Sequence, residues 1–195
     1  MRYEKGHKET TRQRILETAA ARFRKEGIES VGVADVMAEA GLTVGGFYSH
    51  FASKEELVRE AMNTASDRSR INFDKRIEEG GLEAWIRFYL STGHRDQPER
   101  GCSAAALGAE LARHPESSRE GFGENMIRIA DAIEAHLPKT IKPAERKKTA
   151  IGIFATLIGA LQMARTVPDP EVSQQILDAG RATAFSLAQI PNTKK

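Results

Sequence analysis

The sequence of 195 residues has little of what defines several other protein classes. Its single cysteine, Cys102, excludes an internal disulfide and a secreted scaffold held by disulfides, and fits a reducing cytoplasm. The longest apolar stretch, residues 150–164, is interrupted by Thr156 and Gln162. It is shorter than the roughly 20 residues that cross a bilayer. The charged N-terminus has no apolar run typical of a signal peptide. We therefore expect a cytoplasmic protein with no membrane segment.

Strand patterns are almost absent as well. The one alternating β-branched run, residues 31–33, is too short for a strand, whereas apolar residues recur at helical spacing nearly everywhere else. The composition, with 40% hydrophobic and 29% charged residues, is that of a globular protein. The sequence predicts an all-α protein of about nine helices.

Charge is unevenly distributed along the chain. The formal net charge is +2, but residues 1–25 hold eight Lys/Arg against three acids, a local charge of +5. A basic arm on a mildly acidic body suggests contact with a polyanion at one end. The alternative is an ordinary solvated helix face.

Turn and cap residues divide residues 1–53 into three short helices. We expect Thr10 or Thr11 to cap a first helix that Gly27 ends, and Gly32 with Asp35 to start a second that Gly41 closes. Thr43 is expected to cap a third helix over 44–51 through its hydroxyl, and Ser53 a fourth that reaches about residue 79.

The second and third helices and their tight turn form a helix-turn-helix, whose second helix is sized for the major groove of DNA. An apolar set is spaced to form its core: Phe23, Val36, Met37, Leu42, Val44, Phe47 and Phe51. The outward face carries small or hydrogen-bonding residues and no carboxylate: Thr43, Gly45, Gly46, Tyr48, Ser49 and His50. Lys54 adds a positive charge at the next helix N-terminus, where phosphate binds readily.

Residues 12–62 resemble the DNA-binding domain of the TetR family of transcriptional regulators. The resemblance lies in the run from Gly41 to Leu57, preceded by residues 15–20 and Phe23. It implies a helix-turn-helix domain over 1–53 and a helical ligand-binding and dimerisation domain over 54–195. It further implies a homodimeric repressor that a small-molecule ligand releases from a palindromic double-stranded DNA operator.

The resemblance also implies individual DNA contacts. Thr43, Tyr48, His50 and Lys54 would contact phosphates, and Gly45 and Gly46 would face the bases. Because two glycines offer no side-chain donor, base reading would depend on the backbone, on Val44 or Ser49, or on DNA shape. The alternatives without a DNA contact are that Tyr48 and His50 pack in the core and that the glycines allow close packing.

The C-terminal residues suggest a core, a pocket and an interface. Aromatic and methionine residues at helical spacing are candidates for a ligand pocket, although they could equally be core: Trp85, Phe88, Tyr89, Phe122, Met126 and Met163. The last two helices, residues 144–166 and 170–188, are too apolar for a monomer to cover, and small residues would let helices approach. We expect a four-helix bundle across a two-fold axis through Gly152, Leu157, Gly159, Ala160, Ile176, Leu177, Gly180 and Ala184. The alternative is that these residues pack within one subunit.

Cys102 has two interpretations. It begins a predicted helix near Arg95 and Arg100, and a helix N-terminus with neighbouring cations favours a thiolate, as in an oxidant or electrophile sensor. Alternatively it is a small buried hydrophobe. The histidines lack metal-ligand spacing and no catalytic motif occurs, so we expect no metal, no cofactor and no enzymatic activity.

Overall fold

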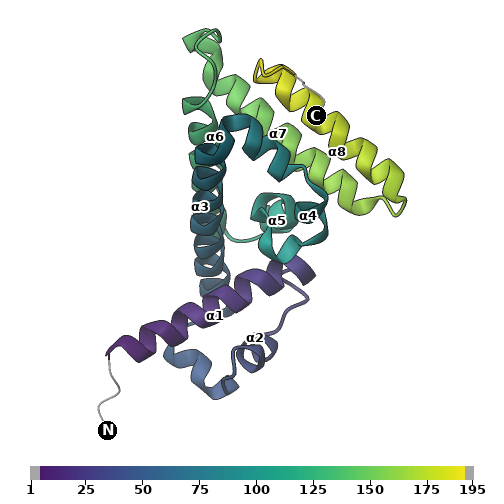
Figure 1. The fold of residues 1–195 in the computed structure, drawn as a ribbon. Coiled ribbons are helices and arrows are strands. Elements are labelled where there is room, and N and C mark those ends of the chain that lie inside the picture. The colour runs from purple at the N-terminus through teal and green to yellow at the C-terminus, as the bar shows by residue number, and fades with distance from the viewer. Residues whose placement is uncertain (1–4, 192–195) are drawn as a thin grey trace. The chain divides into compact units, whose positions relative to one another are not determined.

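The computed structural model describes residues 5–191, and within this range all regular secondary structure is helical, as predicted. Arg2 and Glu4 of the basic segment, and the tail 192–195, lie outside the described residues. The helices are α1 (Lys5–Glu26), α2 (Val33–Glu39), the 3-10 helix η1 (Val44–Ser49), α3 (Lys54–Tyr89), α4 (Thr92–Asp96), the 3-10 helix η2 (Pro98–Arg100), α5 (Ser103–Leu111), α6 (Glu116–Ala135), α7 (Pro143–Thr166) and α8 (Pro170–Leu187) (Figure 1).

The chain divides into two compact units. Unit 1 comprises residues 1–68 and 98–123, and unit 2 comprises residues 69–97 and 124–195. The units do not follow the predicted boundary after residue 53, because η2, α5 and the start of α6 belong with the N-terminal helices. That boundary therefore stays a prediction about where DNA binding resides.

Unit 1 is built around the inner face of α1. Ile15, Ala19 and Phe23 recur at helical spacing and are at most 1% exposed. They are buried together with apolar residues of α2, η1, the loop after η1 and the start of α3, namely Val36, Met37, Phe47, Phe51, Leu57 and Val58. Two members of the predicted core differ: Leu42 is half-buried, and Val44 is 49% exposed. Val44 thus faces outward and was wrongly placed in the core.

Glycines end α1 and α2, as predicted. Gly27 and Gly41 have φ of +90° and +70°, a conformation that L side chains rarely adopt. After α2, the Gly41 N–H donates to the Ala38 carbonyl and the Leu42 N–H to the Met37 carbonyl, at 3.0 and 2.8 Å. This is a Schellman arrangement, which closes the helix and sets the turn of the helix-turn-helix.

Two expectations for the N-terminal helices are wrong. Helix α1 begins before Thr10, so neither Thr10 nor Thr11 caps it, and the Thr10 hydroxyl instead donates to the Gly6 carbonyl. The Thr43 hydroxyl makes no capping hydrogen bond to η1, although Thr43 is the N-cap residue. The third helix is also shorter than expected and is a 3-10 helix, which fits the low helix propensity of Gly45 and Gly46.

The predicted helix end at residue 79 is a kink inside α3. Gly81 has φ of +69°, and the helix resumes after it and continues to Tyr89. At its start α3 is capped as predicted, since the Ser53 hydroxyl accepts from the Glu56 N–H at 3.1 Å. The Glu56 carboxylate in turn accepts from the Ala52 N–H at 2.6 Å. The side chains of Ser53 and Glu56 therefore each accept a backbone hydrogen bond at this helix end.

In unit 2, α7 and α8 pack along each other (Figure 1). The helices lie close together at Gly180, because a Cβ built there would lie 2.4 Å from the Cβ of Ala160. Leu157, Leu177 and Phe185 are fully buried. By length and composition alone, α7 is apolar enough to cross a membrane.

Candidate functional site

In the helix-turn-helix, one side of η1 is exposed and the other is held by buried aromatic residues. Phe47 is buried and stacks on Phe51, with ring centroids 5.6 Å apart. The neighbouring Tyr48 is 76% exposed, which excludes the alternative that it is a core aromatic. Thr43 and Ser49 are also exposed, although the Ser49 hydroxyl donates to the Gly46 carbonyl at 2.6 Å.

Gly45 and Gly46 differ in their surroundings. A Cβ at Gly45 would meet nothing within 4 Å, and one at Gly46 would make ordinary contact with Met37 and Thr43. Internal packing therefore does not require glycine at either position. Open space at Gly45 leaves the η1 backbone accessible to a large ligand.

Two cations of α1, Lys8 and Arg12, act on His50 at the end of η1. Burial, and then the charges of Lys8 and Arg12, lower the pKa of His50, which is half-buried at the end of η1. The Nδ1 atom of His50 is buried and has no hydrogen-bond partner among the described residues. Arg12 lies over the Phe51 ring at 4.6 Å and pairs with Glu60 of α3 at 2.5 Å, which ties α1 to α3. Lys54 is the first residue of α3 and is half-buried.

Cys102 is the N-cap residue of α5 and is half-buried, so it is neither a fully buried hydrophobe nor freely exposed. A charged neighbour is Arg24 of α1, which the sequence gave no reason to expect. Arg24 is 5% exposed, and burial lowers its pKa to about 10. Its guanidinium donates from Nε to the Glu99 carbonyl at 3.0 Å, so it holds α1 against η2.

The residues proposed to line a ligand pocket do not form one group. Trp85 and Tyr89 are buried in an aromatic cluster with Phe73 and Phe154. Met163 is 59% exposed and Phe88 half-buried, whereas Phe122 is buried in the other unit and Met126 half-buried. Met163 is therefore wrong as a pocket residue of the single chain.

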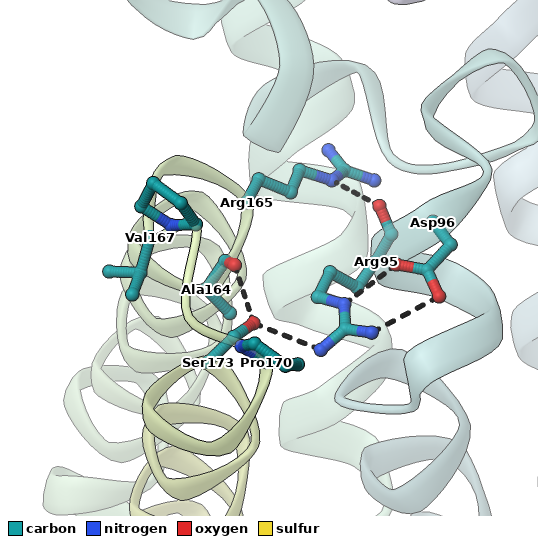
Figure 2. Close-up of a pocket in the computed structure, with 8 residues that line it drawn as sticks. Arg95, Asp96, Ala164, Arg165, Val167, Pro170 and Ser173 are labelled. Atoms are coloured by element: carbon teal, nitrogen blue, oxygen red, sulfur yellow. Dashed lines mark hydrogen bonds and ion pairs between the residues drawn. The ribbon is translucent and has the colours of Figure 1, made fainter.

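Unit 2 instead contains a cavity of about 250 Å³ where α4 meets α7 and α8. Figure 2 shows its lining, which includes two guanidinium groups and a hydroxyl: Arg95, Asp96, Ala164, Arg165, Val167, Pro168, Pro170 and Ser173. Arg95 donates to Ser173 at 2.9 Å and to the Asp96 carboxylate at 2.7 Å. Sequence reasoning missed this cavity; the one available signal was Arg165, a charge at the end of an apolar helix.

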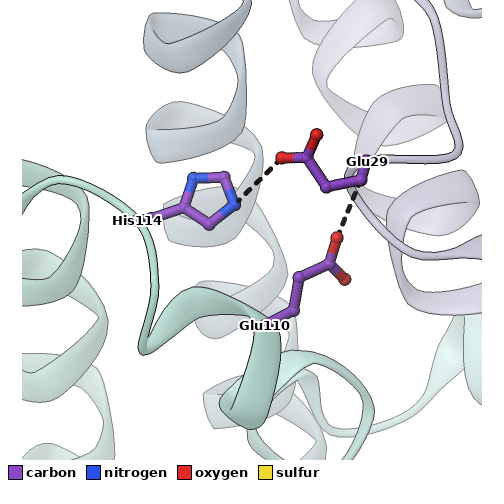
Figure 3. A group of neighbouring side chains, drawn as sticks. All are labelled: Glu29, Glu110 and His114. Carbon is purple, nitrogen blue, oxygen red and sulfur yellow. Dashed lines mark hydrogen bonds and ion pairs between the residues drawn. The ribbon is translucent and has the colours of Figure 1, made fainter.

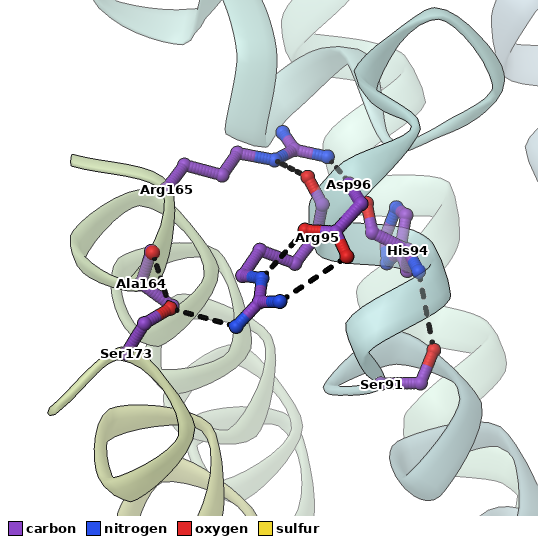
Figure 4. Close-up of polar contacts among 7 residues, drawn as sticks. All are labelled: Ser91, His94, Arg95, Asp96, Ala164, Arg165 and Ser173. Atoms are coloured by element: carbon purple, nitrogen blue, oxygen red, sulfur yellow. Dashed lines mark hydrogen bonds and ion pairs between the residues drawn. The ribbon is translucent and has the colours of Figure 1, made fainter. Parts of the chain in front are cut away.

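Backbone carbonyls hold the second guanidinium in place. Arg165 donates from Nε to the Arg95 carbonyl at 3.1 Å and from Nη2 to the His94 carbonyl at 2.7 Å (Figure 4). His94 itself is 8% exposed, and burial lowers its pKa to about 4. Its Nδ1 lies 2.7 Å from the Tyr89 carbonyl, so the neutral ring donates there.

Five of the eight proposed interface residues are buried within the single chain: Leu157, Ala160, Leu177, Gly180 and Ala184. They are buried inside the chain, where Gly180 of α8 meets Ala160 of α7, so they do not offer a surface to a second chain. Gly152, Gly159 and Ile176 are half-buried. The exposed apolar residues of these helices are others, with Ile151 45%, Val172 40% and Leu187 39% exposed.

Comparison with known proteins agrees with the helix-turn-helix geometry. Residues 15–61 match the profile of the family described as bacterial regulatory proteins, tetR family. The chain is 36% identical over 86 residues to the uncharacterized HTH-type transcriptional regulator YfiR of Bacillus subtilis (strain 168), covering 44% of this chain and 42% of YfiR. It is 42% identical over 57 residues to the HTH-type transcriptional repressor KstR2 of Mycobacterium tuberculosis, covering 29% of this chain and 28% of KstR2.

The matched segments thus span less than half of the length of either relative. The structural similarity covers much more of the chain than these sequence matches do. A solved structure of a TetR-family transcriptional regulator from Cytophaga hutchinsonii superimposes with a TM-score of 0.78, covering 96% of this chain and 98% of that one at 20% identity. The likeness at this identity concerns the fold alone.

Proposed function

The chain belongs to the TetR family of transcriptional regulators, and from this premise we propose that it is a repressor that binds a palindromic DNA operator as a homodimer. The family is not one of enzymes, so the proposal concerns binding rather than catalysis. The observation that carries it is the exposed face of η1, on which Tyr48 is 76% exposed and residues 42–53 contain no acid, together with the α1 cations Lys8 and Arg12, whose charges act on His50 at the end of η1. We place the protein in the cytoplasm, where the operator is.

The roles of individual residues follow from chemistry and exposure. Thr43, Tyr48, His50 and Lys54 would donate to phosphates, which supply position and affinity rather than sequence. Val44 is exposed and could contact a thymine methyl, and Ser49 could approach a base edge. Gly45 and Gly46 would allow the η1 backbone to approach the groove closely.

The test uses DNA selected from a random double-stranded pool by the purified protein. We expect Lys54→Ala to weaken binding to selected and unselected sequences about equally, and to make the dependence of affinity on salt less steep by about one counterion per chain. Lys148→Ala is the matched control, because that side chain is 84% exposed on α7. A changed sequence preference with an unchanged salt slope would contradict the role given to Lys54.

Dimerisation would use the outer faces of α7 and α8 rather than their mutual contact. Ile151, Ala155 and Gly159 lie on one stripe of α7 at four-residue spacing, and Val172, Ile176 and Leu187 lie along α8; none of the six is buried within the chain. Pairing two such surfaces across a two-fold axis gives a four-helix bundle. The bundle would fix the distance between the two η1 helices.

A small-molecule effector would bind in unit 2. The cavity beside Arg95 and Arg165 is a candidate for this role, and its guanidinium groups favour a ligand with a carboxylate or phosphate. Such a ligand would compete with Asp96 for Arg95. Arg95→Gln should then abolish release of DNA by an anionic effector without weakening DNA binding in its absence.

The alternative is induction through Cys102. What favours it is the position of the thiol at the start of α5, half-buried and near the buried cation Arg24. An electrophile or peroxide would then release DNA from the wild type and not from Cys102→Ser. Equal release from both proteins would contradict this alternative.

A further inference from the structure

Unit 1 gathers three potential metal ligands that are far apart in the sequence. Glu29 lies in the loop after α1, Glu110 in α5 and His114 in the loop after α5, and their ligand atoms lie within 4.8 Å of one another (Figure 3). With Glu55 of α3 they line a cavity of about 310 Å³. Because these three residues are far apart in the sequence, the spacing of the histidines predicts no metal site here.

The hydrogen bonds of His114 determine which ring nitrogen faces the cluster. Its Nδ1 lies 3.2 Å from the Glu55 carboxylate, which also accepts from the Ser118 hydroxyl. The Nδ1–H therefore donates to Glu55, and in the neutral ring the lone pair is on Nε2. The side chain of His114 is only 9% exposed, and its Nε2 lies 3.8 Å from a Glu29 oxygen, beyond hydrogen-bond distance.

The Nε2 lone pair thus faces carboxylates that are themselves acceptors. Glu110 is held by the Glu29 N–H, which donates to its Oε1 at 2.7 Å, and Gly27 leaves room for its Oε2, which lies 3.3 Å from where a Cβ on Gly27 would stand. Among the described residues no hydrogen bond joins Nε2 to either carboxylate. A cation at this point would satisfy all three acceptors.

We propose that Glu29, Glu110 and His114 form a binding site for a divalent transition-metal ion such as Zn²⁺. One imidazole and two carboxylates are a common ligand set for such ions, with water as a fourth ligand. Glu55 acts through His114, because a histidine that binds a metal usually donates its other N–H to a carboxylate. Glu55 is therefore a positioning residue.

Size and charge agree with this assignment. Ligands of tetrahedral zinc at about 2.0–2.2 Å from the ion lie about 3.4 Å apart, so the three side chains must close by roughly 1 Å. The Glu29 side chain is 80% exposed and can make that movement. Three carboxylates outweigh Arg113, an exposed cation that also lines the cavity, so the local charge favours a cation.

Bound metal would join the loop before α2 to the end of α5. Both belong to unit 1, so the ion would stiffen the base from which the helix-turn-helix extends. Because the ion would bind the folded chain and not the unfolded one, Zn²⁺ should raise the unfolding temperature in a concentration-dependent way.

The test measures metal binding directly, with no DNA present. The metal-free full-length chain is titrated with Zn²⁺ against a chromophoric chelator, and with Co²⁺ while its visible absorption is recorded. We expect one ion per chain, with tetrahedral Co²⁺ bands. Glu29→Gln, Glu110→Gln and His114→Gln should each lower the affinity at least tenfold, and Glu55→Gln should lower it less.

Two matched variants serve as controls. Glu116→Gln alters an exposed carboxylate nearby, and His136→Gln alters an exposed histidine in unit 2, so neither should change the affinity. Glu29→Gln keeps the test decisive if the buried variants fail to fold, since its side chain is exposed. Absence of stoichiometric Zn²⁺ binding by the wild type, or equal loss in the controls, would overturn the proposal.

Discussion

At the scale of single residues, the burial of His94 makes the free energy of unfolding depend on pH. Its ring stacks on Phe88 and meets Tyr89 edge-on, with centroids 5.8 and 4.8 Å away. Because burial lowers its pKa from 6.5 to about 4, the unfolded chain binds a proton between these values and the folded chain does not. The stability that His94 confers is therefore complete above pH 6.5 and is lost as the pH falls towards 4.

We predict that this loss reaches on the order of 3 kcal/mol, at about 1.4 kcal/mol per unit of pKa shift. The free energy of unfolding, measured by denaturant titration between pH 7 and 4, should fall less steeply for His94→Asn, which keeps a donor for Tyr89 but does not titrate. His136→Asn is the control, because His136 is exposed. Identical pH profiles for the wild type and His94→Asn would contradict the burial argument.

At the scale of elements, the contact of α7 with α8 depends on Gly180. A Cβ there would lie 2.4 Å from the Cβ of Ala160, closer than real Cβ contacts allow, and a tight 3.1 Å from the Leu90 side chain. We predict that Gly180→Ala lowers the free energy of unfolding by about 1–3 kcal/mol through overpacking.

The matched variant is Gly123→Ala in α6, where a Cβ would meet nothing within 4 Å. It should raise stability by about 0.5–1 kcal/mol, because alanine is the better helix former. Thermal and chemical unfolding of both variants provide the measurement. If the two substitutions had the same sign, close packing at Gly180 would not be the controlling feature.

Local signals were predictable from the sequence and long-range ones were not. Gly27, Gly41 and Ser53 were identified correctly because each acts within one helical turn. The Thr43 cap was wrong because N-cap position does not guarantee that the hydroxyl turns inward. Glu29 and Glu110 meet across 81 positions of the chain. Their meeting depends on how α1 packs against α5, which helical periodicity does not encode.

The same reason explains the interface residues. Periodicity correctly showed that α7 and α8 are apolar on more than one side. It could not tell which stripe meets the other helix and which faces outward, and small residues such as Gly180 were assigned to the wrong one. The exposure of Tyr48 was easier to predict, because it follows from the burial of Phe47 and Phe51 on the other side of η1.

At the scale of the whole molecule, we predict a dimer held by the outer face of α7 and α8. Static light scattering at micromolar concentration should give twice the chain mass for the wild type and one chain mass for Ile151→Glu. Ile71→Glu is the matched control, since Ile71 is 67% exposed on α3 and Ile151 45% exposed on α7. Ala184→Glu should instead unfold the chain, because Ala184 is fully buried within it.

We predict that the dimer also determines how DNA is read. Two η1 helices related by a two-fold axis would enter successive major grooves about 34 Å apart, or a multiple of that distance. Ile151→Glu should therefore lose operator binding although it leaves η1 and its neighbours unchanged. A monomeric wild type that still bound DNA tightly would contradict this coupling.

The measurement that tests the central claim most directly is the selection of binding sites from random double-stranded DNA. We predict enrichment of an inverted repeat, bound by an even number of chains with an affinity that falls steeply as salt increases. Loss of that enrichment in Tyr48→Ala would place η1 on the DNA. No enrichment above the starting pool, or an enriched site without two-fold symmetry that one chain binds, would contradict the account.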